Sequence, residues 1–288
     1  MIKKCLFPAA GYGTRFLPAT KSIPKEMLPI VNKPLIQYGV EEAADAGMTD
    51  IAIVTGRGKH AIEDLFDNNH IIEAAVHGTD KESLLEETNR LMETCTFSYT
   101  RQKKMKGLGD AILSGEPLVG DLPFGVVLAD DLCASAHGQN GILAQMVKIY
   151  EQYHCSIIAI EEVPEPDTHK YGIISGTEIE PGLYRVEDMV EKPRGAAPSN
   201  LAIIGRYILT PDIFDLLRNT PAGAGGEVQI TDALKGQINN GGVIAYKFRG
   251  RRFDCGSIHG FIQATNYFYS HFPASDSPRQ PEKTDSSA

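Results

Sequence analysis

The sequence lacks the cysteine and histidine patterns that mark a zinc site or a disulfide framework. Its five cysteines stand far apart, and no two of them form a C-x-x-C pair. Its eight histidines give no H-x-x-H or H-E-x-x-H spacing. Zinc centres and disulfide-stapled domains need close spacings, so both are disfavoured and a reducing compartment is expected.

Positive charge and long apolar runs are also scarce. Lys and Arg number 28 against 37 Asp and Glu, which gives a formal net charge of −9. Nucleic-acid binding usually needs a basic surface, so no nucleic-acid partner is expected. No apolar run is long enough to cross a membrane, and the short run that ends at Pro8 is too short for a secretory signal. We expect a cytoplasmic protein without a membrane partner.

What the sequence does contain is an alternation of short apolar strands and helical segments. The predicted strands of the first half are Lys3–Pro8, Asp50–Thr55, Thr96–Thr100 and Phe124–Leu128, and a helix is expected after each. The first helix is expected over Lys33–Ala46, with Asn32 as its cap and Pro34 in its first turn. This alternation predicts an α/β fold with an open, mostly parallel, Rossmann-like sheet flanked by helices.

The second half of the chain has a different pattern. Three extended runs with little helix between them predict an antiparallel strand addition to the main sheet: Tyr171–Ser175, Leu183–Glu191 and Leu201–Leu209. Helices are expected again at Asp212–Arg218, Val228–Asn239 and Ser257–Tyr269. We predict a single domain over residues 1–272. Residues 273–288, rich in Pro and Ser, are expected to form a disordered C-terminal tail.

The segment AAGYGTR, Ala9–Arg15, directly follows the first predicted strand. Ligands of open α/β sheets bind beyond the carboxyl ends of the strands, where this segment is expected. A lone G-x-G is equally well explained as a tight turn, and the dinucleotide fingerprint G-x-G-x-x-G is broken by Phe16. Arg15 and Lys25, however, add two cations to one glycine-rich loop, which favours a polyphosphate ligand.

The stretch AAGYGTRFLPATKSIPKEMLPIVNKPLI resembles the signature of sugar-1-phosphate nucleotidylyltransferases, and most closely that of the bacterial UTP–glucose-1-phosphate uridylyltransferases. The similarity continues in order through Gln102 with GLGDA, LADD, YGII, VEKP, GEVQITDAL and FDCGS, as far as about Phe268. It implies the nucleotide-diphospho-sugar transferase fold. It also implies that UTP and glucose-1-phosphate react by direct in-line attack, with Mg²⁺, to give UDP-glucose and pyrophosphate. The family often forms oligomers, so a homodimer or homotetramer is expected.

The resemblance implies a role for each motif. Arg15 and Lys25 would hold the triphosphate and stabilise the leaving pyrophosphate. Gln102 would contact the imide edge of the base, since its amide both donates and accepts hydrogen bonds. Glu191 would accept hydrogen bonds from the sugar, and Lys192 would hold the sugar phosphate. The other implied contacts are Ala9, Ala10, Gly11, Gly13 and Gly107 to the nucleotide, Gly172 to the sugar, and Glu26 either to the nucleotide or within the loop. Many family members carry histidine where this chain has Asp110.

The resemblance also implies two magnesium ligands. Asp130 follows the apolar run FGVVL, and Asp254 lies in RRFDCGS. Mg²⁺ prefers hard oxygen ligands, with few protein carboxylates and with phosphates and water in the remaining positions. Asp131 could replace Asp130 in this role, and Asp254 could instead be an acid at a helix N-terminus.

Other functions remain open from the sequence. The nucleotide could be dTTP, because uracil and thymine present the same pairing edge to Gln102, and the sugar-1-phosphate could differ. A non-catalytic sensor of nucleotide sugars would be expected to lose Arg15, Lys25, Asp130 or Lys192. All four are present, which disfavours a sensor.

Overall fold

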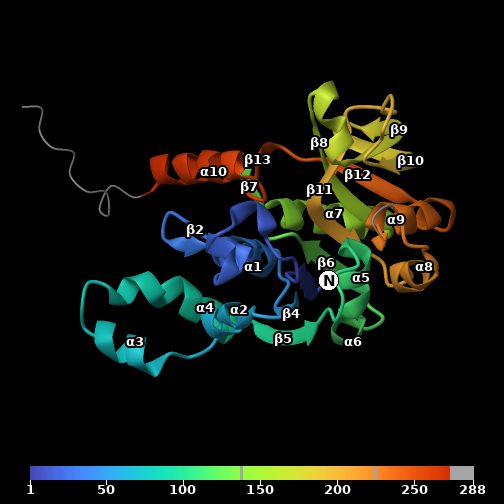
Figure 1. Cartoon of the computed structure of the whole chain (residues 1–288). Helices are drawn as coiled ribbons and strands as arrows, with labels where there is room; N and C mark the ends of the chain where they lie inside the picture. Colours follow the sequence, from blue (N-terminus) through green and yellow to red (C-terminus); the bar gives the residue numbers. More distant parts are fainter. Residues whose placement is uncertain (137–138, 224–225, 273–288) are drawn as a thin grey trace, which may run out of the picture.

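A nine-stranded mixed sheet lies at the centre of the molecule, with helices on both of its faces (Figure 1). The computed structural model describes residues 1–136, 139–223 and 226–272, so the tail predicted for 273–288 lies outside the described residues. Within those ranges no helix is long and apolar enough to cross a membrane. In spatial order the strands are β5 (Thr96–Arg101), β4 (Asp50–Thr55), β1 (Lys4–Pro8), β6 (Phe124–Val127), β11 (Leu201–Leu209), β8 (Ser156–Glu162), β12 (Val243–Lys247), β10 (Leu183–Glu191) and β9 (Gly172–Glu180).

The sheet is parallel only in part. β5, β4, β1 and β6 are parallel neighbours, as predicted. β11 then runs antiparallel to both β6 and β8, and it also pairs with β9 between Ala202 and Ile173, which closes five strands into a ring. The antiparallel strand addition predicted for Tyr171–Ser175, Leu183–Glu191 and Leu201–Leu209 is confirmed. The prediction of an open sheet is wrong, because β9 and β11 close this half into a ring. Every residue of β11 is buried, and a continuous apolar strand has no pattern that reveals which strands it pairs with, so the closure was not predicted.

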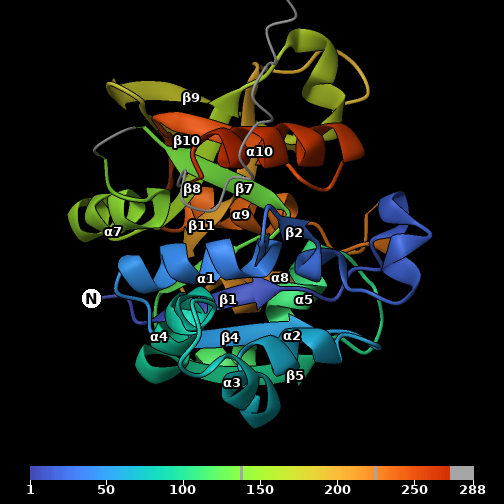
Figure 2. The same ribbon diagram turned by 90° about the vertical axis from the view of Figure 1, so that its left-hand side faces the viewer.

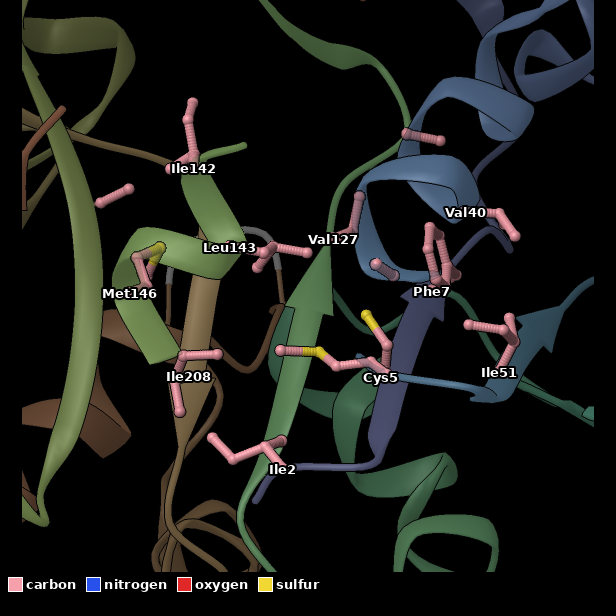
Figure 3. Packing of buried hydrophobic residues seen from close by; sticks show 14 of the residues in the cluster. Ile2, Cys5, Phe7, Val40, Ile51, Val127, Ile142, Leu143, Met146 and Ile208 are labelled. Atoms are coloured by element: carbon pink, nitrogen blue, oxygen red, sulfur yellow. The ribbon is translucent and has the colours of Figure 1, made fainter. Parts of the chain in front are cut away.

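Strand β1 shows how the two faces of the sheet are covered. Cys5 and Phe7 pack beneath α1 (Leu35–Asp45) and α7 (Ile142–Tyr153), and Figure 3 shows this cluster. Leu6 packs on the opposite face, because successive side chains of a strand alternate between faces. That face is covered by α5 (Leu108–Ser114), α8 (Ile213–Asn219) and α9 (Ile230–Asn239).

Smaller elements surround the main sheet. A two-stranded sheet of β7 (Asp131–Ser135) and β13 (Gly250–Asp254) lies beside α10 (Ile258–Ser270), as Figures 1 and 2 both show. The remaining strands and α-helices are β2 (Pro29–Ile30), β3 (Lys33–Pro34), α2 (His60–Leu65), α3 (His70–Val76), α4 (Glu86–Thr94) and α6 (Glu116–Val119).

Two local predictions are corrected by the structure. The first helix begins at Leu35, with Pro34 at its N-cap, because Lys33–Pro34 pairs with Pro29–Ile30. Asn32 lies in the turn between these strands and does not cap the helix. The helix expected directly after Phe124–Leu128 is replaced by β7, whose partner β13 lies more than a hundred residues away in the chain. Such distant pairing leaves no local pattern.

Candidate active site

The loop after β1 folds back on itself and brings Lys25 against the glycine turn. Gly13 has a φ of +65°, a conformation that favours glycine. A Cβ atom at Gly13 would lie 3.0 Å from Lys25 Cβ and 3.2 Å from Thr20 Cγ2. The Thr20 hydroxyl donates to the Gly13 carbonyl at 2.7 Å and holds the fold of the loop. Glycine at this position therefore allows Lys25 to approach the turn.

A cavity of about 400 Å³ opens at the carboxyl ends of β1 and β6. Its wall combines backbone of the glycine loop with side chains from several distant segments. Of the predicted site residues it is lined by Ala10, Gly11, Gly13, Lys25, Gln102, Gly107 and Asp130. Ala9 and Glu26 are buried outside this lining. Apolar walls with a few convergent polar groups are typical of small-ligand sites.

Lys25 and Asp130 form an ion pair in the cavity wall. The Lys25 Nζ lies 2.5 Å from Asp130 Oδ2, and both side chains are half-buried. Burial opposes charge on each group, yet Asp130 and Glu26 raise the pKa of Lys25 above its ordinary value. Burial also works to raise the pKa of Asp130, but Lys25 holds it below its ordinary value. Both groups are thus kept charged where an anionic ligand and a cation would meet.

Behind this pair lies a second, more deeply buried one. The Lys59 Nζ lies 2.6 Å from Glu26 Oε2, and both side chains are buried. Burial raises the pKa of Glu26 and lowers that of Lys59. Glu26 therefore holds the short 3₁₀ helix Lys25–Met27 against the loop that follows β4. The sequence analysis missed Lys59; the only available signal was its place in a Gly-rich loop after a predicted strand.

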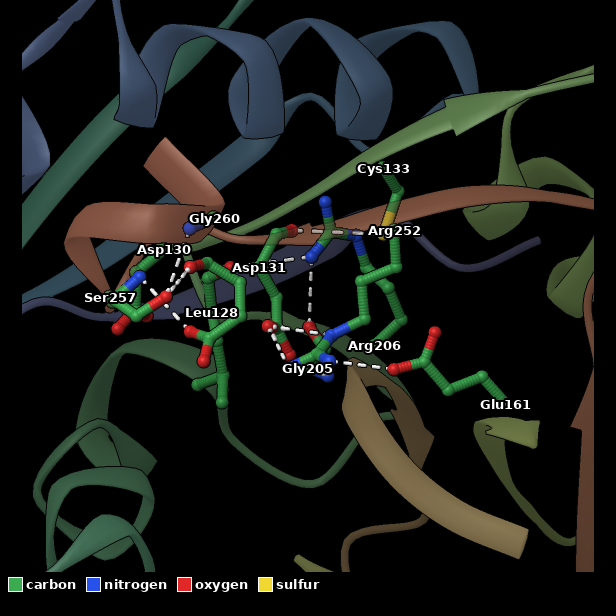
Figure 4. A network of polar contacts seen from close by, with 12 residues as sticks. Leu128, Asp130, Asp131, Cys133, Glu161, Gly205, Arg206, Arg252, Ser257 and Gly260 are labelled. Atoms are coloured by element: carbon green, nitrogen blue, oxygen red, sulfur yellow. Dashed lines mark hydrogen bonds and ion pairs between the residues drawn. The ribbon is translucent and has the colours of Figure 1, made fainter. Parts of the chain in front are cut away.

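Asp131 is engaged in a buried network, which Figure 4 shows, and it does not line the cavity. Its Oδ2 accepts a hydrogen bond from the Gly205 backbone N–H at 2.6 Å. Its Oδ1 lies 2.6 Å from Arg252 Nη2, and Arg252 also pairs with Glu161 at 2.6 Å. Both carboxylate oxygens of Asp131 thus have protein partners, which favours Asp130 over Asp131 as a metal ligand. Arg252 is a further residue that the sequence analysis missed.

Asp130, Asp254 and Arg15 converge around Gly256. A Cβ atom at Gly256 would lie 2.9 Å from Asp130 Oδ2, 3.0 Å from Asp254 Oδ1 and 3.3 Å from Arg15 Nη1. Arg15 Nη1 also donates to the Gly256 carbonyl at 3.3 Å. Burial, followed by the nearby charges of Asp131 and Asp130, raises the pKa of Asp254. A cation between these two carboxylates would relieve their repulsion.

The two carboxylates beside Gly256, those of Asp130 and Asp254, suit Mg²⁺ better than a transition metal. Among the described residues, no three His, Cys, Asp or Glu side chains gather into a metal-binding group. Two carboxylates leave several positions for phosphate and water oxygens, as Mg²⁺ prefers. The helix-cap role considered for Asp254 belongs to Ser257, whose side chain accepts from the Gly260 backbone N–H at 3.1 Å.

The loop that carries Gln102 is clamped to the segment GEVQ. Gly107 has a φ of +91°, and a Cβ atom there would lie 2.8 Å from Glu227 Cβ and 2.9 Å from the Val228 carbonyl oxygen. The Val228 backbone N–H donates to the Lys106 carbonyl at 2.7 Å. Only glycine fits at position 107, because any side chain there would collide with Glu227 and Val228. The close approach of this loop to GEVQ therefore depends on Gly107.

A second cavity, of about 600 Å³, adjoins the first. Glu191 and Lys192 line it, and Glu227 lines both cavities. Lys192 has a φ of +44°, which is uncommon for a residue with a side chain and sharply turns the chain after β10. Its Nζ lies 3.3 Å from Glu191 Oε1. A Cβ atom at Gly172 would lie 3.1 Å from Glu191 Oε2, so this buried glycine leaves room for the carboxylate.

Comparisons with known proteins agree with this arrangement. The model of the nucleotidyl transferase family matches residues 6–270. A relative from Pseudomonas aeruginosa named UTP–glucose-1-phosphate uridylyltransferase is 64% identical, covering 94% of this chain and 98% of the relative. The crystal structure of apo UDP-glucose pyrophosphorylase superposes with a TM-score of 0.91 at 59% identity, covering 94% of this chain and 99% of that one. UDP-glucose pyrophosphorylase complexed with UDP-glucose gives a TM-score of 0.87 at 57% identity, with coverages of 94% and 100%.

Proposed function

The chain belongs to the nucleotidyl transferase family, and we propose that it transfers the uridylyl group of UTP to glucose-1-phosphate, forming UDP-glucose and releasing pyrophosphate. The observation that carries this function is the pair of adjoining cavities. One contains Gln102 and the Lys25–Asp130 pair, the other contains Lys192, and Glu227 borders both. A relative named for this reaction and a related structure with UDP-glucose bound support the choice of substrates.

In the proposed mechanism the protein positions two anions and stabilises charge. The glucose-1-phosphate oxygen attacks the α-phosphorus of UTP directly, and the bond to the β-phosphate oxygen breaks as pyrophosphate leaves. Such transfers depend mainly on positioning and electrostatics. Lys192 holds the sugar phosphate and reduces its repulsion of the triphosphate, while Arg15 and Lys25 stabilise the leaving pyrophosphate. Glu191 accepts hydrogen bonds from the sugar.

Asp130 and Asp254 are the proposed ligands of Mg²⁺. One oxygen of each lies within 3.0 Å of the position that a Cβ atom at Gly256 would take, and Arg15 Nη1 lies 3.3 Å from it. When bound, the ion supplies positive charge that orients the phosphate oxygens and favours loss of pyrophosphate. Asp130 lines the cavity of about 400 Å³ that also contains Gln102, which we call the nucleotide cavity. The support for this assignment is that Asp130 lines the nucleotide cavity and that burial, with the nearby carboxylates, raises the pKa of Asp254.

The function is tested by measuring pyrophosphate release with Mg²⁺ while UTP, dTTP, CTP, ATP and GTP are crossed with several sugar-1-phosphates. We expect release with UTP and glucose-1-phosphate. A preference for dTTP would keep the mechanism and change the nucleotide. No release with any pair, together with retained UDP-glucose binding, would favour the sensor function instead.

Replacing Lys192 with methionine tests the sugar-phosphate site. We expect the KM for glucose-1-phosphate to rise about tenfold, because a hydrogen bond to a charged phosphate is lost. The KM for UTP should stay close to the wild-type value. Lys170→Met, at an exposed lysine that lies outside both cavities, is the matched control. Equal increases in both KM values would contradict a specific contact with the sugar phosphate.

We also propose an oligomeric assembly, a cytoplasmic location and a single domain for this protein. A homodimer or homotetramer is proposed on the family resemblance, and a monomer mass in solution would contradict it. A cytoplasmic location is supported by five cysteines, all of which are free. A single domain over 1–272 is supported by the one nine-stranded sheet that both halves of the described chain share.

A further inference from the structure

The side-chain amide of Gln102 donates a hydrogen bond to Asp110, which lies outside the nucleotide cavity. Gln102 Nε2 donates to Asp110 Oδ2 at 2.7 Å and to the Gly107 carbonyl at 3.2 Å. Gln102 is buried and lines the nucleotide cavity. Asp110 does not line this cavity. Asp110 instead lines a neighbouring cavity together with Lys103, Lys104 and Lys106. Asp110 can therefore act on a bound base only through Gln102.

An aspartate at this position determines which way the Gln102 amide points. An ionised carboxylate accepts hydrogen bonds and donates none, so it requires the amide nitrogen to face it. The Gly107 carbonyl, which also only accepts, requires the same orientation. The amide oxygen is then directed away from both acceptors. Within the described part of the chain, no side chain or backbone group donates a hydrogen bond to Gln102 Oε1.

The position of Asp110 is itself fixed by the backbone. It lies in the first turn of α5, where a negative charge is favourable. The preceding Gly109 N–H donates to the Val228 carbonyl at 2.9 Å, and a Cβ atom at Gly109 would lie only 2.8 Å from that oxygen. The start of α5 is thus anchored to the GEVQ segment, and the carboxylate cannot easily move away from Gln102.

We propose that Asp110 is a positioning residue that sets base specificity by fixing the Gln102 amide with its oxygen toward the base. This inference rests on the proposed function and deepens it. The N3 position of uracil carries a hydrogen that Gln102 Oε1 can accept, whereas N3 of cytosine is an acceptor. A fixed amide oxygen therefore favours uridine nucleotides over cytidine nucleotides, and it does not distinguish uracil from thymine. A neutral asparagine at 110 could donate as well as accept, so only the longer bond to the Gly107 carbonyl, at 3.2 Å, would still oppose a turned amide.

The test is Asp110→Asn, which keeps the shape of the side chain and removes its acceptor-only character. We expect the ratio of kcat/KM for UTP to that for CTP to fall about tenfold, the value of one hydrogen bond to a charged group. The KM for glucose-1-phosphate should not change. Asp121→Asn, at an exposed aspartate outside the nucleotide cavity, is the matched control. An unchanged UTP-to-CTP ratio in a folded Asp110→Asn protein would overturn the proposal.

Binding of UDP and CDP, measured by calorimetry, separates this inference from the proposed function. If the wild type releases no pyrophosphate, the proposed reaction fails, but a preference for UDP that Asp110→Asn reduces would still support the role of Asp110. If turnover is normal and both proteins prefer UDP equally, the reaction stands and the role of Asp110 is wrong. Because binding needs no turnover, both outcomes can be read from the same preparations.

Discussion

Lys25→Ala should lower kcat by about 100- to 1000-fold, the loss expected when a preorganised charge at a transition state is removed. Lys25 lies in the wall of the nucleotide cavity, 2.5 Å from Asp130. Negative charge grows on the leaving pyrophosphate as the α-phosphorus bond breaks, so a fixed ammonium group there acts mainly in the transition state. The KM for UTP should change much less than kcat. Steady-state kinetics with a coupled pyrophosphate assay measures both.

The effect should not come from unfolding. The Lys25 side chain is 22% exposed and that of Asp130 is 28% exposed, so removing the ammonium group leaves a carboxylate that water can reach. Lys21→Ala, at an exposed lysine on the same loop, is the control and should keep wild-type kcat. Lys25→Arg keeps the charge and should recover part of the rate. A wild-type kcat in Lys25→Ala would exclude a role in catalysis.

The position of the glycine loop and of its cations is predictable from the sequence. The end of β1 and the cations that follow it were predicted from local patterns, and the structure brings Gly13, Lys25 and Gln102 to one cavity. Local patterns suffice here because strand β1 and its loop are contiguous, and because parallel strands end at the same edge of the sheet.

The partners of these residues could not be predicted in the same way. Glu26 is separated from Lys59 by 33 positions, and Asp131 from Arg252 by 121. Each of these contacts depends on the packing of distant segments, and a charged residue in the sequence gives no sign of whether it is buried. The closure of the sheet through β11 and β9 was missed for a related reason, since the residues of β11 are buried on both faces and do not reveal its partners.

The adjacent residues Asp130 and Asp131 should respond oppositely to alanine substitution. Asp131→Ala removes one partner of the buried Arg252, whose side chain is only 7% exposed, and leaves the Gly205 N–H without its acceptor. Breaking a buried ion pair in this way costs about 3–5 kcal/mol of unfolding free energy. Urea unfolding followed by circular dichroism should show a much lower midpoint. Glu161 still pairs with Arg252, so the lower end of that range is expected.

Asp130→Ala should instead leave the unfolding midpoint near that of the wild type and abolish most of the activity. Its half-exposed carboxylate is the proposed Mg²⁺ ligand, and loss of charge stabilisation by the ion should lower kcat at least about 100-fold. Raising the Mg²⁺ concentration should restore part of the rate, because Asp254 still faces the same space beside Gly256. If Asp131→Ala were stable and inactive while Asp130→Ala were active, the ligand would be Asp131. Comparing the two substitutions thus distinguishes Asp131, which stabilises the fold around the site, from Asp130, which is proposed to bind the metal ion.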